Sequence, residues 1–155
     1  MGALRLGTAV GLALLLTGCA SPAAPTPSVT CPDPAPMAHV YHSYRLHVLA
    51  ACVSAMGTVE LVRQEPDGDV HIRLRLDAGQ ALTNAANDSG QRGDLVLEIV
   101  CVGPVTQADA QDACSSYQNA LMVPAIGQHI AASGPWVTDA DHGWNEIHPV
   151  ETLGR

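Results

Sequence analysis

The chain has 155 residues and a formal net charge of −8 at pH 7; its seven basic residues are all arginine, and it has no phenylalanine. An acidic chain without lysine lacks the basic surface that phosphate backbones require, so nucleic-acid binding is not expected. The same charge balance disfavours a chain that lies flat on anionic lipid.

The N-terminus has the organisation of a secretory signal peptide. Arg5 supplies an early positive charge, an apolar run extends from Leu6 to Leu16, and two small residues precede Cys19. The run is shorter than the roughly 20 apolar residues that a membrane-spanning helix needs. We therefore predict that residues 1–18 are a signal peptide; the alternative is an ordinary secreted protein cut near Ala20 or Ala24.

The tetrapeptide Leu16-Thr17-Gly18-Cys19 resembles the bacterial lipobox. In that motif the cysteine thiol carries a diacylglycerol, and the cysteine becomes the first residue after cleavage. The resemblance implies lipidation at Cys19, with acyl chains such as palmitate, and a location at the cell membrane facing outside the cytoplasm. Two or more acyl chains give stable anchoring where one does not.

A proline-rich segment follows the predicted lipidation site. Residues 19–36 contain six prolines among alanine, serine and threonine. Such a composition cannot bury a core and favours extended, polyproline-like conformations. We predict a tether over residues 19–36 and one folded domain over residues 37–155.

Four cysteines remain after Cys19, and an even number in an exported chain indicates two disulfides with three possible connectivities. We favour Cys101–Cys114, which would join a helix to the end of a strand, and Cys31–Cys52, which would fasten the tether to the domain. Each bridge could contribute about 3 kcal/mol through chain entropy. A thiolate metal site is the alternative, but no two cysteines have the close spacing typical of one.

The hydrophobic pattern predicts five strands and one helix. Along Val70–Asp77 apolar residues alternate with His71, Arg73 and Arg75, which is typical of a strand with one buried face and one exposed face. Residues 78–93 are polar and small and are predicted to form a loop, with one helical turn as an option. The helix is predicted over Asp109–Asn119. The other predicted strands are Arg45–Arg63, Leu95–Val102, Gly127–Val137 and Trp144–Val150.

This order predicts a mainly β fold, a five-stranded OB-like Greek-key barrel with one helix between strands 3 and 4. An open antiparallel sheet with one helix across it is the alternative. Four blocks resemble segments of small exported prokaryotic OB-fold-like domains, and the resemblance implies the fold while leaving the activity open. The blocks are Gly57–Glu60, Asp67–Ile72, Leu95–Cys101 and, the most specific, Asp139–Val150.

Two groups of side chains are candidates for ligand binding. His71, Arg73 and Arg75, on the predicted exposed strand face, could clamp a small anion, and Trp144 could join them. Ligands of OB-folds commonly bind on that sheet face. The alternative is a solvated strand face with no ligand.

His142, Glu146 and His148 are the candidate metal ligands. Two imidazoles and a carboxylate form many catalytic zinc sites, which keep a fourth position for water. The spacing lacks the helical geometry of an HExxH motif, so turn formation and hydrogen bonding explain these residues as well.

The sequence favours a non-enzymatic envelope lipoprotein whose domain binds an envelope protein or a small ligand, with no cofactor. No nucleophile elbow, phosphate-binding glycine loop or dinucleotide fingerprint is present. The alternatives are a metal-dependent, phosphodiesterase-like hydrolase using zinc or another divalent ion, and a structural spacer in a larger assembly.

Overall fold

A computed structural model describes residues 1 and 30–154 of the chain. The predicted signal peptide, Cys19 and most of the predicted tether lie outside the described residues. The short helical segments are η1 (Pro36–His39), η2 (Ser43–Arg45), α1 (Ala85–Gly90), η3 (Ala108–Ala110) and α2 (Gln111–Cys114). The strands are β1 (Leu46–Gln64), β2 (Val70–Leu76), β3 (Leu95–Ile99), β4 (His129–Asp139), β5 (Asn145–Ile147) and β6 (Thr152–Gly154).

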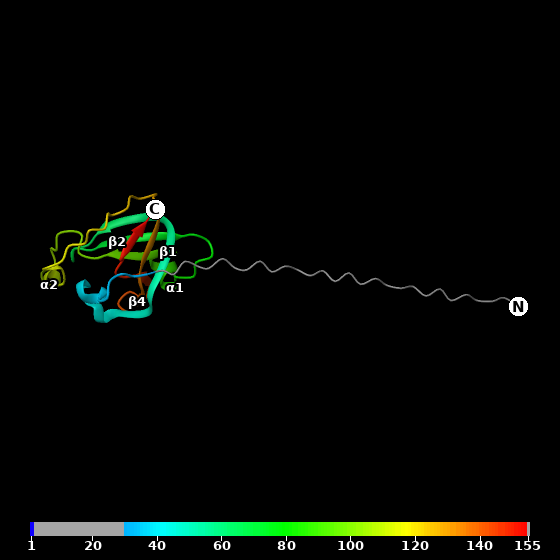
Figure 1. Cartoon of the computed structure of the whole chain (residues 1–155), viewed down its shortest axis with the longest axis horizontal. Helices are drawn as coiled ribbons and strands as arrows, with labels where there is room; N and C mark the ends of the chain where they lie inside the picture. The colour runs from blue at the N-terminus through cyan, green and yellow to red at the C-terminus, as the bar shows by residue number, and fades with distance from the viewer. Residues whose placement is uncertain (2–29, 155) are drawn as a thin grey trace.

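The fold is mainly β (Figure 1). One six-stranded mixed sheet has the order β1-β2-β3-β5-β4-β6. β1 also pairs with β4, so hydrogen bonding runs from β1 through β2, β3, β5 and β4 back to β1. β3 and β5 are parallel, and the other pairs are antiparallel. The long β1 therefore pairs with β4 along its first part and with β2 along its last part.

β1 changes partners at Gly57. This residue pairs with Leu76 of β2 and with Ile130 of β4. A Cβ atom at position 57 would overlap the backbone carbonyl of Arg75, so only glycine fits there. The register shifts of β1 lie on either side of this residue, between Val48 and Val53 and between Val59 and Leu61.

The main core lies on one face of the strands and consists of branched aliphatic side chains. Ile72, Leu74, Leu95, Leu97 and Ile147 are fully buried in it. A second, smaller cluster includes Val40, Leu46, Val100 and Val137. Because Val100 and Leu97 belong to different clusters, β3 and the segment after it are covered on both sides. The continuous apolar run in the sequence reflects this double burial.

Both favoured disulfides are present. Cys31 is joined to Cys52 and Cys101 to Cys114. The first bridge attaches the last residues of the proline-rich segment to β1, and the Asp33 N–H adds a 2.8 Å hydrogen bond to Glu151. Residues 31–36 are therefore held against the domain.

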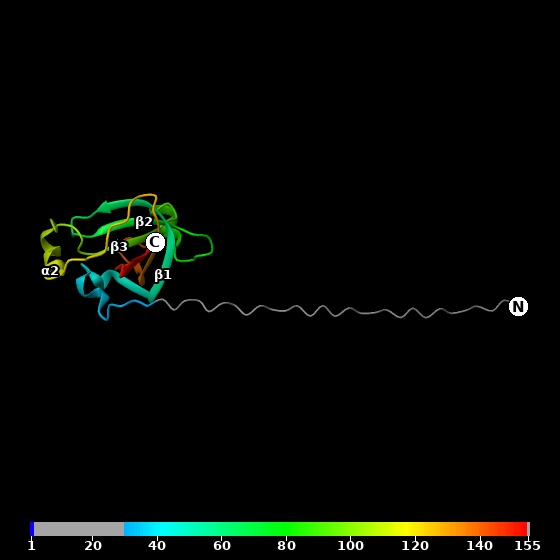
Figure 2. The same cartoon turned by 45° about the horizontal axis from the view of Figure 1, so that its top comes forward.

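The structure corrects two of the predicted elements. Helix continues only to Cys114 rather than Asn119, and α2 lies at one end of the molecule beside η1 (Figures 1 and 2). The predicted strand Trp144–Val150 is interrupted, because Pro149 has no N–H for a strand ladder, so β5 ends at Ile147. The chain then forms the unexpected β6 against β4. Within residues 30–154, no helix has the length and apolar character needed to cross a bilayer.

Candidate functional site: a polar cavity on the outer face of the strands

A cavity of about 210 Å³ lies on the face of β2 and β3 that points away from the main core. Its walls come from five strands, β1 to β5, from the turns that precede β2 and β5, and from Arg45 of η2 and Gln107 before η3. We call it the polar cavity. Its lining residues are Arg45, Arg63, Glu65, Pro66, Asp67, Asp69, His71, Glu98, Gln107, Asp139, His142, Trp144, Glu146 and His148.

The floor of the polar cavity is a row of three side chains from adjacent strands. His71 of β2 is directly opposite Glu98 of β3. β3 and β5 are parallel, and their register pairs Val96 with Glu146. The same register, continued by two residues, places His148 beside Glu98. The Val150 N–H donates a 2.8 Å hydrogen bond to the Glu98 carbonyl, which supports this continuation. Strand register alone thus brings together residues that are 27 and 50 positions apart in the sequence.

The two histidines of this floor each contact a carboxylate, His71 that of Glu98 and His148 that of Glu146. The His71 Nδ1 atom lies 2.7 Å from Glu98 Oε1, and the His148 Nδ1 atom lies 3.2 Å from Glu146 Oε1. The indole N–H of Trp144 donates to the other oxygen of Glu146 at 3.3 Å. The side chains of His148 and Glu146 are each only 2% exposed, so this pair is withdrawn from water.

The turns cover the floor and add two further carboxylates. Asp69, before β2, accepts a 2.8 Å hydrogen bond from the backbone N–H of Cys101. Asp139, at the end of β4, pairs with Arg45 at 3.3 Å and with Nδ1 of His142 at 2.9 Å. The His142 ring stacks on Trp144 with centroids 4.3 Å apart. Trp144 is thereby fixed as one wall of the cavity.

The pKa values of four groups in the polar cavity are raised, for different reasons in the carboxyl groups and in the histidines. Burial raises the pKa of Asp69 to about 7, and the charge of Asp67 adds to the rise. Burial also raises the pKa of Glu98 against the opposing effect of His71. Burial lowers the pKa of His71 and of His148, but hydrogen bonds and charges from Glu98 and Glu146 outweigh it, so both pKa values are raised. These four groups therefore keep their protons to higher pH than free side chains do, whereas at Asp139 burial is outweighed by hydrogen bonds from His142 and the Asp141 N–H, so its pKa is lowered.

Several polar atoms of this site are buried without a hydrogen-bond partner. They include His148 Nε2 and Glu98 Oε2, from two neighbouring residues of the cavity floor. Arg45 Nε is a third, although the same guanidinium reaches Asp139 through Nη1. Buried polar atoms are nearly always hydrogen-bonded, so three such atoms around one cavity make it the candidate binding site.

The predicted metal ligands occupy different positions in the polar cavity. Glu146 and His148 are buried and bonded to each other, whereas His142 is half-exposed and bonded to Asp139. Among the residues that the structure describes, ligand atoms of three such side chains come within 4.8 Å only at Asp69, Cys101 and Cys114. Cys101 and Cys114 are joined to each other, so they offer no thiolate to a metal.

The four residues of the predicted ligand face do not form one site. His71 and Trp144 line the polar cavity, but Arg73 and Arg75 are not among its lining residues. Arg73 pairs with Asp94 at 3.5 Å, and the exposed Arg75 pairs with Glu60 at 2.7 Å. The prediction that His71 is exposed is wrong, because the turns before β2 and β5 cover that end of the strand.

Sequence analysis did not single out Glu98, Asp69, Asp139, Arg45 or Arg63 as site residues. Glu98 carried a usable signal, because it is the one charged residue within the apolar run Leu95–Val102. A charge in a strand buried on both faces needs a partner there. The other four come from segment ends, where the sequence shows no pattern that joins them.

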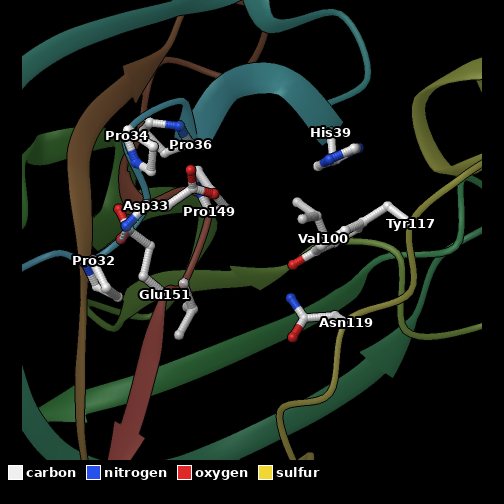
Figure 3. Close-up of a pocket in the computed structure, with 11 residues that line it drawn as sticks. Pro32, Asp33, Pro34, Pro36, His39, Val100, Tyr117, Asn119, Pro149 and Glu151 are labelled. Atoms are coloured by element: carbon white, nitrogen blue, oxygen red, sulfur yellow. Dashed lines mark hydrogen bonds between the residues drawn. The ribbon is translucent and has the colours of Figure 1, made fainter.

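A second cavity of about 310 Å³, here called the proline-lined groove, lies between residues 32–36 and the domain (Figure 3). Pro32, Pro34 and Pro36 stand on one side of it, and His39 and Tyr117 on the other. The His39 and Tyr117 rings stack with centroids 4.0 Å apart. The groove is therefore the seam between the attached N-terminal segment and the domain.

Comparisons of the chain with protein-family models, with curated proteins and with solved structures each give no match.

Proposed function

We propose that this protein is a lipid-anchored extracytoplasmic lipoprotein whose OB-like domain binds a small polar ligand in the polar cavity. One observation carries the proposal: the cavity floor contains two unpartnered buried atoms, His148 Nε2 and Glu98 Oε2. Folding would bury these atoms at a cost unless something completes their hydrogen bonding. A bound ligand would supply that partner.

The strand order supports the OB-like part of the proposal. Pairing runs β1-β2-β3-β5-β4-β1, and helical residues lie between β3 and β4, as in a five-stranded Greek-key barrel of the OB type. Ligands of that fold commonly bind on the outer face of its second and third strands. The polar cavity opens over the same two strands, at His71 and Glu98.

The anchor rests on the lipobox-like segment ending in Cys19 and on the proline-rich residues after it. The Cys31–Cys52 bridge supports this arrangement, since disulfides are typical of exported proteins. A tether that is fixed to β1 at position 52 would hold the domain at a limited distance from the membrane.

A metal-dependent hydrolase is the second candidate, and one contact favours it. Metal-bound histidines usually donate their other ring nitrogen to a carboxylate, and His148 makes this contact to Glu146 while its Nε2 stays unpartnered. His142 would have to leave Asp139 to complete the predicted ligand set of His142, Glu146 and His148.

The anchor is tested by growing cells that express the full chain with radiolabelled palmitate. We expect label in the wild-type protein, membrane fractionation of that protein, and loss of both in Cys19→Ser. An unlabelled wild-type chain would contradict the lipoprotein assignment. A Cys31→Ser variant is the matched control, because its cysteine lies in the same region but should not be acylated.

The binding function is tested on the full chain in detergent with a panel of small anions, neutral polyols, organic cations and divalent metals. The chain has two tryptophans, so Trp136→Phe leaves Trp144 as the single reporter on the cavity wall. We expect at least one class to change Trp144 emission, with the change lost in folded His148→Ala. A panel in which no class changes the emission would reject the proposed function. Zinc or manganese binding with turnover of a phosphodiester would favour the hydrolase.

A further inference from the structure

We infer that the ligand of the polar cavity is a small organic cation whose ammonium group is held by Glu98 and His148. This inference rests on the proposed binding function and specifies the ligand chemistry. Three features of the cavity carry it: the balance of charge on its walls, the hydrogen-bonding character of its unpartnered floor atoms, and the lack of a three-ligand metal cluster among its described side chains.

The walls of the polar cavity carry more negative than positive charge. Six carboxylates and two guanidinium groups line it. Both guanidinium groups are already paired, Arg45 with Asp139 and Arg63 with Glu65. The remaining carboxylates, Asp67, Asp69, Glu98 and Glu146, have no arginine partner among the cavity walls. A buried excess of carboxylates requires protons or a cation, and a cation is the ligand that this charge balance attracts.

The two unpartnered floor atoms are suited to accept hydrogen bonds from an ammonium group. Glu98 Oε2 is a carboxylate oxygen, and its sister atom Oε1 is already engaged by His71. When His148 is neutral and donates from Nδ1 to Glu146, its Nε2 carries a lone pair. An ammonium N–H directed at each atom would satisfy both. The indole of Trp144 lies on the same cavity wall, where aromatic rings stabilise organic cations.

The lack of a three-ligand cluster among the described side chains of the polar cavity favours an ammonium group over a bare metal ion. A metal ion needs at least three ligand atoms within a few ångströms of one another. In the described residues no three side chains of the polar cavity bring ligand atoms within 4.8 Å of one another; the one such group uses the two disulfide-bonded cysteines. An ammonium group donates from three separate N–H bonds. A cavity of about 210 Å³ also has room for several heavy atoms beyond the charged nitrogen.

Protons compete with this cation for the same site. His148 must be neutral for Nε2 to accept, and Glu98 must be ionised. Their pKa values are raised, so a bound cation displaces protons. Affinity should therefore rise with pH, by up to about tenfold per pH unit for one displaced proton. The other titratable or charged groups facing this site are Asp69 and Asp67 from the turn before β2, His71 from β2, Glu146 from β5, Asp139 from β4, Arg45, Arg63, Glu65 and His142.

The experiment compares propylammonium, propanol, propionate and zinc as probes of the full chain in detergent. The first three have similar size and differ in charge. NMR follows the imidazole signals of His71 and His148 and the indole N–H of Trp144 at pH 5.5 and pH 7.5. We expect saturable shifts with propylammonium only, at least tenfold weaker binding at the lower pH, and proton release on binding.

Glu98→Gln should weaken propylammonium binding at least tenfold, because the amide keeps an oxygen for His71 but loses the charge. Glu151→Gln, in the proline-lined groove, is the matched control and should bind normally. The pH comparison uses the unaltered chain, so it remains decisive if Glu98→Gln does not fold. Binding of propionate, propanol or zinc without propylammonium would overturn the inference while leaving the binding function intact. Binding of none of the four overturns the inference, and the wider panel then decides the binding function separately.

Discussion

The polar cavity and the proline-lined groove meet at neighbouring residues of the chain but differ in the chemistry of their walls. His148 contributes to the polar cavity, whereas Pro149, Val150 and Glu151 line the groove. The groove is the larger of the two, at about 310 Å³ against about 210 Å³. Its prolines pack on one side and its stacked rings on the other, and one buried atom without a hydrogen-bond partner, Glu151 Oε1, belongs to its lining. The polar cavity instead combines carboxylates and histidines with three such atoms, His148 Nε2, Glu98 Oε2 and Arg45 Nε.

This contrast shows why volume alone does not identify a functional site. The groove exists because residues 32–36 are attached across the domain surface by the Cys31–Cys52 bridge and the Asp33–Glu151 hydrogen bond. The polar cavity depends on strand register and on two turns, so it belongs to the domain itself. Changes that detach the N-terminal segment should therefore open the groove and leave the polar cavity intact.

The two disulfides provide the largest expected effect. Replacing either bridge by two alanines should lower the free energy of unfolding by about 3 kcal/mol, because loops of 13 and 21 residues are released in the unfolded chain. The structural consequences should differ. Loss of Cys101–Cys114 should alter Trp144 emission, since Cys101 also donates to Asp69, whereas loss of Cys31–Cys52 should not. Urea unfolding and fluorescence measure both. Equal changes in Trp144 emission would contradict the independence of the two regions.

Glu98 and Glu151 form the next comparison. Glu98→Ala removes the partner of His71 from a buried position and should cost about 2–3 kcal/mol. Glu151→Ala removes an exposed hydrogen bond to the Asp33 backbone and should change the free energy of unfolding by less than about 1 kcal/mol. Urea midpoints of the two variants test the difference. A larger loss in Glu151→Ala would mean that the groove, rather than the cavity, carries the stabilising contacts.

Much of this fold could be predicted from sequence, because hydrophobic periodicity determines which strand faces enter the core. Val70, Ile72 and Leu74 were expected to point inward, and they are fully buried. Their neighbours were expected to be solvated, which is true of Arg75 but not of His71. Alternation cannot reveal that a turn folds over the outer end of a strand, since that contact is made by residues distant in the sequence.

The candidate site was predictable only where its residues are close in the chain. Trp144, Glu146 and His148 share a strand face, so the two-residue spacing placed them together. Glu98 joins them through the parallel pairing of β3 with β5, which no local pattern encodes. The sixth strand was missed for a related reason, because three residues against β4 leave almost no periodic signal.

Asp69 should make stability depend on pH in an unusual direction. Its pKa is about 7 in the folded chain against 3.8 for a free side chain, so between these values the folded state holds more protons. Stability should therefore fall as pH rises from about 4 to 7. Glu98, His71 and His148 act in the same direction, since their pKa values are also raised.

Asp69→Asn keeps an acceptor for the Cys101 N–H and removes the titration. Between pH 4.5 and pH 7.5 the wild type should lose about 3 kcal/mol more stability than the variant, measured by urea unfolding at several pH values. Asp67→Asn should have a smaller effect of the same sign, because its charge only adds to the rise at Asp69. Parallel pH profiles for wild type and Asp69→Asn would show that Asp69 is ionised throughout and would weaken the description of the cavity as proton-holding.

The smallest effect is expected for a substitution of Arg75, which lies on the predicted ligand face but outside the polar cavity. Such a substitution distinguishes binding in the cavity from binding along the exposed strand face. The Arg75 side chain is 62% exposed and pairs with Glu60, a contact that water and salt screen. Arg75→Ala should leave the urea midpoint, Trp144 emission and propylammonium binding unchanged. Arg73→Ala is the informative comparison, because Arg73 is largely buried and contacts Asp94 and the carbonyl of Gln91, whose side chain reaches His71. That variant should shift the His71 imidazole signal. A ligand whose binding is lost in Arg75→Ala would place the binding surface along the exposed length of β2 rather than in the polar cavity.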